Sequence, residues 1–449
     1  MPALGPRLVV AGTSSGVGKT TVATGLMAAL AARGLAVASA KVGPDFIDPG
    51  YHAMATGRPP RNLDAWICGS DAISPLAARA GAGADVLVVE GVMGLFDGAA
   101  DGAPSSTAEV AQLLGAPIVL VVDASAMSQS VAALVHGFHT VEPGTALAGV
   151  ILNQIGSDAH EAGLRAALAP LGLPVLGALH RDDRLRWRDR HLGLVPVVEQ
   201  PDVVRRSLDA LAHAVAARCD LDAILQVARG AGPAEVGEAA VARRTGQARV
   251  AVVGGPAFSF QYPDNLEALV QAGAEVEVVD PLVDERLPGG CQALVAGGGF
   301  PEAFGPALAA NRPLLDDVAE AVGDGLVVWA ECGGLLWLAR SLDGQPMAGV
   351  LDVEGHMTGR LTLGYRSGTI TRDSPLGPAG TPVRGHEFHY STTDPVGDAL
   401  ELRGRHGEGT TGFAAPRLLA SYLHLHLGGD PAPAEAFVAA ASGAAPRRR

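Results

Sequence analysis

The chain has 449 residues, of which 48% are hydrophobic and 18% charged, which is enough apolar material for two or three folded domains and excludes a disordered protein. Its formal net charge of −14 argues against a protein that binds nucleic acid through an extended basic face. The four cysteines, Cys68, Cys219, Cys291 and Cys332, form no CxxC pair, so neither a zinc cluster nor a disulfide framework is expected.

The N-terminal residues lead directly into an apolar strand, without the charged and apolar regions of a signal peptide. No apolar run reaches the length of about 18 residues that a membrane span needs. We therefore expect a cytoplasmic protein that does not cross a membrane.

The first half of the chain alternates short apolar runs with alanine-rich helical stretches at 20–32 and 107–114. The runs are continuously apolar, which is typical of strands buried on both faces of a parallel sheet. The expected strands are residues 8–11, 36–41, 86–90, 118–123, 149–153 and 175–178. A doubly wound α/β domain over residues 1–195 is predicted.

Residues 196–247 are predicted to hold one amphipathic helix, 207–227, and then a linker rich in Gly, Ala, Pro and Glu. A second α/β pattern follows, and it predicts a domain over residues 248–435. Its expected elements are strands 250–253, 276–279, 293–296 and 326–330 and a helix over 265–272. The remaining residues, 436–449, end in three arginines and are expected to form a flexible tail.

A glycine-rich loop follows the first strand and opens a helix. Backbone N–H groups of such a loop cradle phosphate, and the helix N-terminus adds partial positive charge. Lys19 is expected to reach the terminal phosphates of ATP, and the Thr20 hydroxyl to bind Mg²⁺. The spacing departs from GxxxxGK[ST], because Thr13 stands in place of the first glycine. The predicted nucleotide-binding residues of the loop are Gly12, Thr13, Gly16, Gly18, Lys19, Thr20 and Thr21.

The only two lysines of the chain, Lys19 and Lys41, both lie near this loop, which suggests that each supplies a compact ammonium group to the nucleotide site. Glu90 ends the buried strand 86–90 and is our candidate for a second Mg²⁺ ligand. Asp123 ends another apolar strand and is the competing candidate, although we favour a helix cap for it.

Four more aspartates, Asp45, Asp48, Asp64 and Asp97, lie in short turns on the same half of the chain. By spacing alone, a turn that favours aspartate for local hydrogen bonding explains them as well as a site does.

Cys332 has the setting of a nucleophile. It follows an apolar strand, is flanked by small residues and precedes an apolar helix whose N-terminus favours a thiolate. Gly297, Gly298 and Gly299 follow another strand, and their N–H groups are candidates for an oxyanion hole.

Several motifs in the order found here resemble one known family. They are the loop at 12–21, which is similar to that of dethiobiotin-synthetase-like proteins, KVGPDFIDP at 41–49, RNLDAW at 61–66, VVEGVMGLFDG at 88–98, RGHEFH at 384–389, and the segments around Cys332 and His424. Together they cover roughly residues 9–427. They resemble the cobyrinate or hydrogenobyrinate a,c-diamide synthases, which join a P-loop synthetase to a class I glutamine amidotransferase domain.

The resemblance implies that ATP and glutamine are substrates, and that the a and c side-chain carboxylates of a corrin become amides in cobalamin biosynthesis. It ties Asp45, Asp48 and Asp97 to the acceptor carboxylate and Thr20, Asp64 and Glu90 to Mg²⁺. It places Lys41 in the nucleotide site and Asn153 against adenine. Our own hypothesis is that Asp48 accepts a proton from the attacking ammonia.

In the glutaminase half, His424 resembles the base of the H-x-E pattern of class I amidotransferases and would activate Cys332. His426 stands where the glutamate of that pattern belongs. A Cys–His dyad is therefore expected, and the group that orients His424 stays open. The pair His424 and His426 as metal ligands is the alternative.

Alternative acceptors and an alternative class of protein are also compatible with parts of the sequence. A nickel-containing tetrapyrrole is the alternative acceptor, the motifs do not separate cobalt-containing from metal-free corrins, and a homodimer is left open. A cobyric acid synthase is a weaker match, because the glutaminase half of that enzyme carries different motifs around the histidine. A ParA-like ATPase switch shares the N-terminal fold, but such proteins lack a glutaminase half, and Ser14 stands where they carry a signature lysine.

Overall fold

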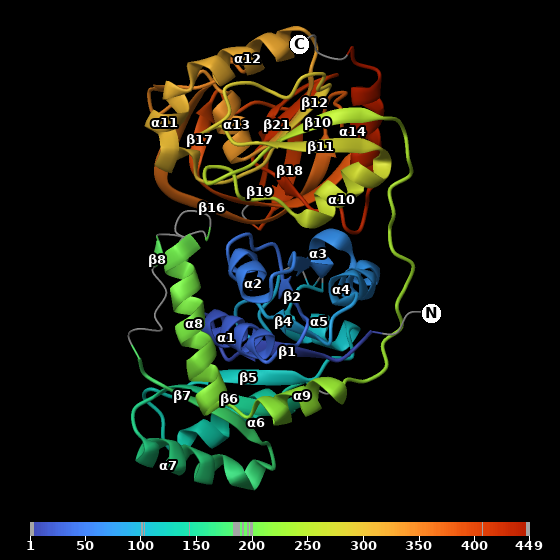
Figure 1. Cartoon of the computed structure of the whole chain (residues 1–449). Helices are drawn as coiled ribbons and strands as arrows, with labels where there is room; N and C mark the ends of the chain where they lie inside the picture. The colour runs from blue at the N-terminus through green and yellow to red at the C-terminus, as the bar shows by residue number, and fades with distance from the viewer. Residues whose placement is uncertain are drawn as a thin grey trace. The chain divides into compact units, whose positions relative to one another are not determined.

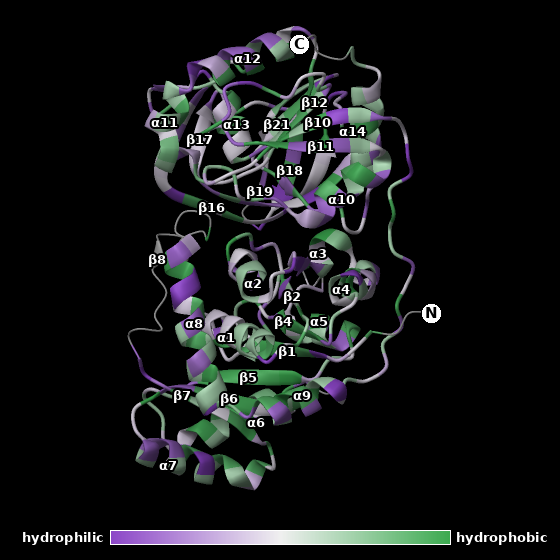
Figure 2. Ribbon diagram, viewed as in Figure 1, coloured by the Kyte–Doolittle hydropathy of each residue, from purple (hydrophilic) through white to green (hydrophobic). Residues whose placement is uncertain are grey.

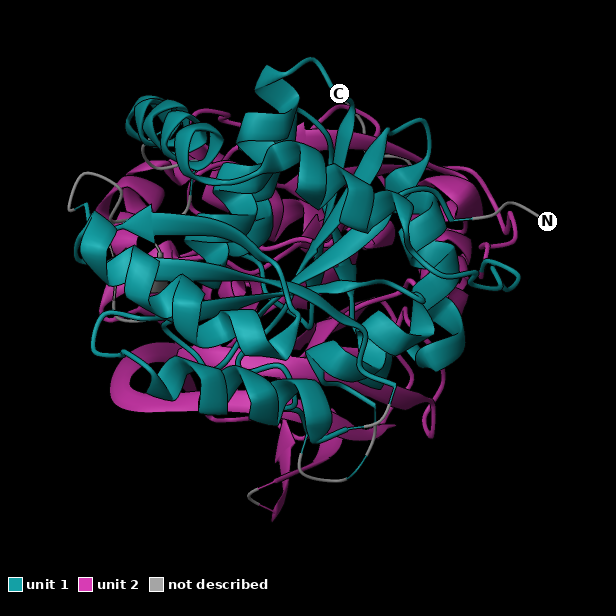
Figure 3. Ribbon diagram, turned by 90° about the horizontal axis from the view of Figure 1, so that it is seen from below, with its two compact units in different colours: residues 1–239 teal, residues 240–449 magenta. Residues whose placement is uncertain are grey.

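The computed structural model describes residues 4–99, 102, 104–142, 144–182, 189–190, 193–194, 197, 201–405 and 407–445. The chain divides into two compact units, Met1–Ala239 and Ala240–Arg449, drawn in teal and magenta in Figure 3. Within the described ranges, no helix combines the length and the apolar character needed to cross a membrane.

A parallel seven-stranded sheet organises the first unit. Its order is β3-β2-β4-β1-β5-β6-β7, and every neighbouring pair is parallel. The strands are β1 (Arg7–Gly12), β2 (Val37–Val42), β3 (Arg61–Leu63), β4 (Val86–Glu90), β5 (Ile118–Asp123), β6 (Leu147–Ile155) and β7 (Val175–His180), beside a separate pair of β8 (Asp189–Arg190) and β9 (Gly193–Leu194). The six predicted strands and the doubly wound α/β class are confirmed.

Helices cover both faces of this sheet (Figure 1). They are α1 (Lys19–Ala32), α2 (Asp48–Thr56), α3 (Ala65–Cys68), α4 (Ile73–Gly81), α5 (Thr107–Leu113), α6 (Ser130–Thr140), α7 (Asp158–Leu168), α8 (Pro201–Arg218) and α9 (Leu221–Arg229). Successive side chains of β1 alternate between the faces: Leu8 and Val10 pack with α1, α8 and α9, whereas Val9 and Ala11 pack with α4 to α7. Burial on both faces explains why the strands are continuously apolar, as Figure 2 shows for β5.

The helical segment after β9 differs from the prediction. The single helix expected over 207–227 is two helices, α8 and α9, separated at Cys219 and Asp220. The Asp220 side chain accepts the Ala223 N–H and caps α9, and the backbone of Cys219 bridges to Gly177 on β7. Because α8 packs on α1, where a Cβ at Gly25 would lie 2.7 Å from Leu211, this segment belongs to the first unit.

Two sheets form the core of the second unit. The first, β11-β10-β12-β13-β21-β20, is parallel except for β20 against β21, and the second, β15-β14-β16-β17-β22, extends through β18 and β19. The strands of the first sheet are β10 (Ala248–Val253), β11 (Ala274–Val279), β12 (Ala293–Ala296), β13 (Val327–Glu331), β20 (Phe413–Ala415) and β21 (Leu418–Ser421). Those of the second are β14 (Ser341–Leu342), β15 (Gln345–Pro346), β16 (Glu354–Ile370), β17 (Pro382–Asp394), β18 (Leu400–Gly404), β19 (Gly407–Thr411) and β22 (His424–Leu425).

The helices of this unit are α10 (Pro263–Ala272), α11 (Gly305–Ala310), α12 (Arg312–Gly323), α13 (Gly333–Leu338) and α14 (Ala432–Ser442). The flexible tail expected from residue 436 is wrong for its first part, because α14 runs to Ser442 and buries Phe437 and Val438 completely. These apolar side chains anchor the helix against the β10 side of the sheet. Residues 446–449 of the expected tail lie outside the described residues.

Arg7 holds the end of the first unit together although it is 97% buried. Its guanidinium group donates to the carbonyl oxygens of Leu114 at 2.6 Å, Gly115 at 3.5 Å and, in the segment after α9, Gly232. These acceptors come from loops far apart in sequence. The side chain therefore acts as a cross-link between the start of β1 and the end of the unit.

We predict that Arg7→Met lowers the free energy of unfolding by about 2–4 kcal/mol, because buried carbonyl groups lose their donor. Urea denaturation followed by circular dichroism measures the change. Arg33→Met is the matched control: its partner Asp222 is exposed, so this surface pair contributes at most about 1 kcal/mol. Equal midpoints for the two variants would contradict the cross-linking role.

Candidate active sites

The register of the first sheet gathers the charged residues at the carboxyl ends of its strands. Lys41 on β2 lies beside Glu90 on β4, and Glu90 lies beside Val10 on β1, just before the glycine-rich loop. Ligands bind at this edge in open α/β sheets. The topology thus brings three motifs that are separate in the chain, at 12–21, 41–49 and 88–98, to one place.

Thr20, Lys41, Asp48 and Glu90 contact one another directly. The Lys41 ammonium lies 2.8 Å from Asp48 Oδ2 and 2.8 Å from Glu90 Oε1. The Thr20 hydroxyl donates to Glu90 Oε1 at 2.6 Å and lies 3.1 Å from Asp48 Oδ2. Four residues predicted separately from sequence therefore form one cluster.

The charged residues of this cluster shift one another's pKa values. Burial disfavours the charged form of Lys41, but Asp48 and Glu90 outweigh burial and raise the pKa of this lysine. Burial also opposes the charged form of Glu90, and the Lys41 ammonium together with His52 holds the pKa of this carboxyl well below its usual range. Burial and the nearby Asp45 raise the pKa of Asp48, against the effect of Lys41.

The glycine-rich loop has the backbone that its glycines allow. Gly16 and Gly18 have φ of 81° and 89°, a region that favours glycine, and α1 begins at Lys19 with Thr20 and Thr21 in its first turn. The Lys19 ammonium donates to the Ser14 carbonyl at 3.1 Å. Burial and the neighbouring Lys41 lower the pKa of Lys19 to about 8.

Asn153 lies near the carboxyl end of β6 and contacts this loop. Its Nδ2 donates to the Val17 carbonyl at 2.9 Å, and a Cβ at Gly18 would lie 2.3 Å from that nitrogen. The contact holds the glycine-rich loop in place, so Asn153 has a structural role in addition to its predicted contact with adenine.

Three of the predicted aspartates make local contacts of the kind that turns favour. Asp45 accepts the N–H groups of Ile47 and Asp48 where α2 begins, and Asp97 accepts the Gly94 N–H at 2.8 Å. Asp64 caps α3 through the Ile67 N–H at 2.8 Å, and it follows β3 at the same edge of the sheet as Lys41.

Sequence reasoning missed His52. This fully buried side chain lies on α2, and its Nε2 is 2.6 Å from Glu90 Oε2. It follows Asp48 by four residues, so both side chains lie on one face of the helix, and that spacing could have indicated it. His52 fixes one oxygen of Glu90 and leaves the other toward Thr20.

The donor set fits Mg²⁺. Of the three predicted ligands, Thr20 and Glu90 are in hydrogen-bond contact beside the loop, and Asp64 follows β3 at the same edge of the sheet. Hard oxygen donors in small number are what Mg²⁺ prefers when phosphates supply its remaining ligands.

The second unit carries Cys332 in a strained turn. Cys332 follows β13 and precedes α13 with φ 48° and ψ −102°, a conformation that L-residues rarely adopt and that is typical of a nucleophile elbow. A Cβ at Gly334 would lie 2.1 Å from the Ala296 carbonyl, so the turn tolerates no side chain there. A Cβ at Gly333 would lie 3.0 Å from Gly299 N, which places the predicted oxyanion glycines beside the elbow.

His424 faces this turn from β22, where it is completely buried. A Cβ at Gly298 would lie 2.5 Å from its Cε1, so the absence of a side chain at Gly298 makes room for the imidazole. Burial opposes the charged imidazolium, but hydrogen bonding to Cys332 and to Glu331 outweighs it and raises the pKa of His424 to about 10. At neutral pH the imidazolium form of His424 is therefore favoured.

His426 has different neighbours. Its ring lies 4.4 Å from that of Tyr262, its Nε2 is 3.9 Å from Asp264 Oδ2, and its Nδ1 accepts the Gly428 N–H. The two histidines thus contact different carboxylates, and the arrangement does not support the alternative in which they share a metal ion.

The 384–389 motif lies on β17, next to the elbow. The Phe388 carbonyl is 3.9 Å from Cys332 Sγ, and His386 pairs with His424 across the strands. Glu387 forms an ion pair of 2.7 Å with Arg366, and burial raises the pKa of that carboxyl despite the arginine. The motif therefore builds one wall of the Cys332 site.

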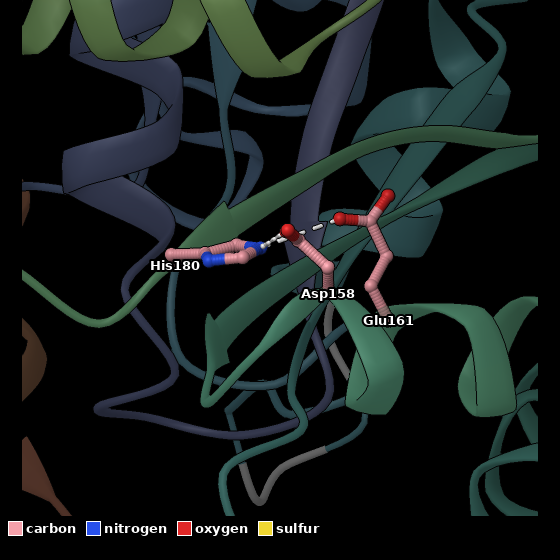
Figure 4. A group of neighbouring side chains, drawn as sticks. All are labelled: Asp158, Glu161 and His180. Carbon is pink, nitrogen blue, oxygen red and sulfur yellow. Dashed lines mark hydrogen bonds and ion pairs between the residues drawn. The ribbon is translucent and has the colours of Figure 1, made fainter.

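Asp158, Glu161 and His180 form a separate group in the first unit, where Nε2 of His180 is 3.5 Å and 3.4 Å from the two carboxylates (Figure 4). Arg165 binds Glu161 at 2.8 Å, and Arg218 lies 3.5 Å from Asp158. Because two arginines neutralise the acids, we assign this group to ion pairing between α7, β7 and α8.

Two known domain families match the chain in the order of its units. Residues 8–195 match the CobQ/CobB/MinD/ParA nucleotide binding domain, and residues 249–432 match the CobB/CobQ-like glutamine amidotransferase domain. The first covers the Lys41 cluster and the second covers both Cys332 and His424.

Curated relatives match over nearly the full length. The chain is 49% identical to a hydrogenobyrinate a,c-diamide synthase of Streptomyces coelicolor, over 96% of this chain and 97% of the relative. It is 44% identical to the enzyme of the same name from Thermobifida fusca, over 97% of each chain. It is 42% identical to a cobyrinate a,c-diamide synthase of Syntrophotalea carbinolica, over 96% of this chain and 98% of that one. With a P-loop nucleotide domain followed by a glutaminase domain, the chain belongs to the hydrogenobyrinate and cobyrinate a,c-diamide synthase family.

Proposed function

We propose that this protein converts the a and c side-chain carboxylates of a corrin acid into amides, using ATP and glutamine, in cobalamin biosynthesis. The observation that supports this most is the match of both units, in order and at up to 49% identity, to relatives named for that reaction. The Lys41 cluster and the Cys332 turn provide the two sets of groups that such a reaction requires.

Hydrogenobyrinate is the acceptor we propose. Relatives named for it are 44–49% identical to the chain, whereas those named for cobyrinate are 40–42% identical. A corrin acid carries several carboxylates, and Lys41 is a cation at the sheet edge that can face such a polyanion. A homodimer remains a prediction.

In the synthetase half, a corrin carboxylate oxygen attacks the γ-phosphorus of ATP, the bond from that phosphorus to the β–γ bridging oxygen breaks, and ADP leaves. Ammonia then attacks the acyl phosphate, phosphate leaves, and an amide remains. Lys19 and Lys41 neutralise charge on the transferring group. Asp45 and Asp97 position the acceptor, and Asp48 accepts the proton that ammonia loses.

Thr20, Glu90 and Asp64 would hold Mg²⁺, with His52 fixing Oε2 of Glu90 so that Oε1 faces Thr20. Bound there, the ion supplies neutralising charge to the β- and γ-phosphates. Asn153 and the loop residues Gly12, Thr13, Gly16, Gly18 and Thr21 position the nucleotide.

In the glutaminase half, the Cys332 thiolate attacks the carboxamide carbon of glutamine. The carbon–nitrogen bond breaks, and the His424 imidazolium gives its proton to the amide nitrogen, which leaves as ammonia. Water then hydrolyses the thioester, with His424 as base, and glutamate leaves.

The substrate assignment is tested with purified protein, ATP, Mg²⁺, glutamine and either corrin acid. Hydrogenobyrinate should gain two amides in succession, seen by mass spectrometry, with kcat/KM higher than that for cobyrinate. Omitting ATP or glutamine is the control. If neither corrin acid is amidated while ATP is still hydrolysed, the proposal is wrong.

Cys332→Ala should lower glutamine-dependent amidation by about 10³-fold or more, because the nucleophile is lost. Amidation with ammonium chloride should stay at the wild-type rate, because the synthetase half is untouched. Cys291→Ala, which removes a buried thiol of the same unit, is the matched control and should keep glutamine use. Loss of both nitrogen sources in Cys332→Ala alone would contradict the division of labour.

Asp64→Asn separates a cap from a metal ligand. Asparagine caps a helix about as well as aspartate, so the melting temperature should not change. As a ligand, however, the neutral amide binds Mg²⁺ more weakly, and the concentration of Mg²⁺ for half-maximal activity should rise by about tenfold. An unchanged Mg²⁺ dependence would reduce Asp64 to a cap.

A further inference from the structure

Glu331 precedes the nucleophile in the chain, yet its side chain contacts the histidine. It is the last residue of β13, and its side chain is 9% exposed. The positive φ of Cys332 turns the chain sharply after it. Glu331 and Cys332 are consecutive in the chain, yet the carboxylate and the thiol therefore approach the His424 imidazole at different places.

Both oxygens of Glu331 are used on β22. Oε2 lies 3.5 Å from Nδ1 of His424, and Oε1 accepts the N–H of Leu425 at 3.0 Å. One carboxylate thus binds the ring of His424 and the backbone directly after it. A side chain attached at both points can fix where that ring lies.

We propose that Glu331 is the positioning residue of His424: its carboxylate accepts Nδ1–H, fixes the tautomer and orients Nε2 toward the Cys332 thiol. The proposal rests on the assignment of Cys332 and His424 made above. The acid comes from the residue before the nucleophile, whereas in the H-x-E pattern it comes from the residue two after the histidine.

The residue two after the histidine, which is the glutamate of the H-x-E pattern, is His426 in this chain. His426 lies against Tyr262 and Asp264, as described above. Because residues i and i+2 of an extended segment face the same way, a glutamate there would reach the histidine in the usual pattern. Here the carboxylate reaches His424 from the neighbouring sheet instead.

The electrostatics agree with this geometry. Burial opposes the imidazolium, and bonding to Cys332 and Glu331 outweighs burial, so that the pKa of His424 rises to about 10. The titratable and charged groups around His424 are Cys332 and Glu331 at the elbow and, from β17, His386, Glu387 and His389. Of these neighbours, Glu331 is the carboxylate within 3.5 Å of its ring nitrogen.

Glu331→Gln is the decisive variant, because the amide has the same shape. Its oxygen can still accept the Leu425 N–H, but the remaining NH₂ is a donor facing the Nδ1–H donor. Glu331→Asp retains a carboxylate on a shorter arm and is the conservative variant. Glu320→Gln, on the exposed side of α12, is the matched control.

The full-length variants are assayed for glutamine hydrolysis across pH and for amidation with ammonium chloride. We expect Glu331→Gln to lower the kcat of glutamine hydrolysis by about 10²-fold, with KM changed less than about threefold. The imidazolium protonates the amide nitrogen, which leaves as ammonia, so activity is lost as pH rises through the pKa of His424. Without the carboxylate that pKa falls, and the alkaline limb should move down by at least about one pH unit. Ammonium-dependent amidation should not change.

The outcomes separate the two levels of the argument. Glu331→Asp should recover part of kcat and keep its alkaline limb near that of the wild type. A kcat within about threefold of wild type in Glu331→Gln, or a loss of kcat with an unmoved alkaline limb, overturns the role of Glu331. Glutamine hydrolysis that survives in Cys332→Ala overturns instead the assignment on which it rests.

Discussion

Parallel strands that end in register are the constraint on which both sites depend. In the first unit, β2 and β4 end side by side, so Lys41 and Glu90 meet although 48 residues lie between them. In the second unit, β13 and β21 end with Glu331 beside Ser421, and Cys332 follows immediately. Because the backbone groups of these strands are satisfied within the sheets, the residues just past each end are free to carry chemistry.

Charge is concentrated at the first of these edges at a cost in solvation. Lys41 and Glu90 are almost completely buried, and isolated ions at such positions would be unstable. Their contacts with each other and with Asp48, Thr20 and His52 compensate for the lost water. Such a balanced group is poised to exchange its internal contacts for those of phosphates and carboxylates, which is why perturbed pKa values gather at functional sites.

The second site depends on a segment that joins two sheets. Residues 418–421 extend the parallel sheet as β21, and His424 and Leu425 then pair with β17 as β22. This crossing puts His424 in front of the Cys332 turn, between Gly298 and the 384–389 wall. The glycines on either side allow the close approach, since any side chain at Gly298 or Gly334 would overlap its neighbour.

The sequence by itself determined the α/β class, and it predicted the phosphate-binding loop around Lys19 and the nucleophile Cys332, because glycine spacing and continuous apolar runs are local properties. The resemblance to class I amidotransferases added His424 as the predicted base. The sequence also indicated the family through motifs that are contiguous in the chain. It did not reveal β3, the break between α8 and α9, or the helix α14, since short or amphipathic segments acquire their structure from packing.

Only the tertiary structure decided which side chains meet. His52 touches Glu90 because α2 folds back over the sheet, and Glu331 touches His424 because β22 crosses from one sheet to the other. Asp64 and Asn153 are seen as a helix cap and a loop support only when their neighbours are in place. Hydrogen bonds and ion pairs act over about 3–4 Å in space, and distance along the chain carries little information about that separation.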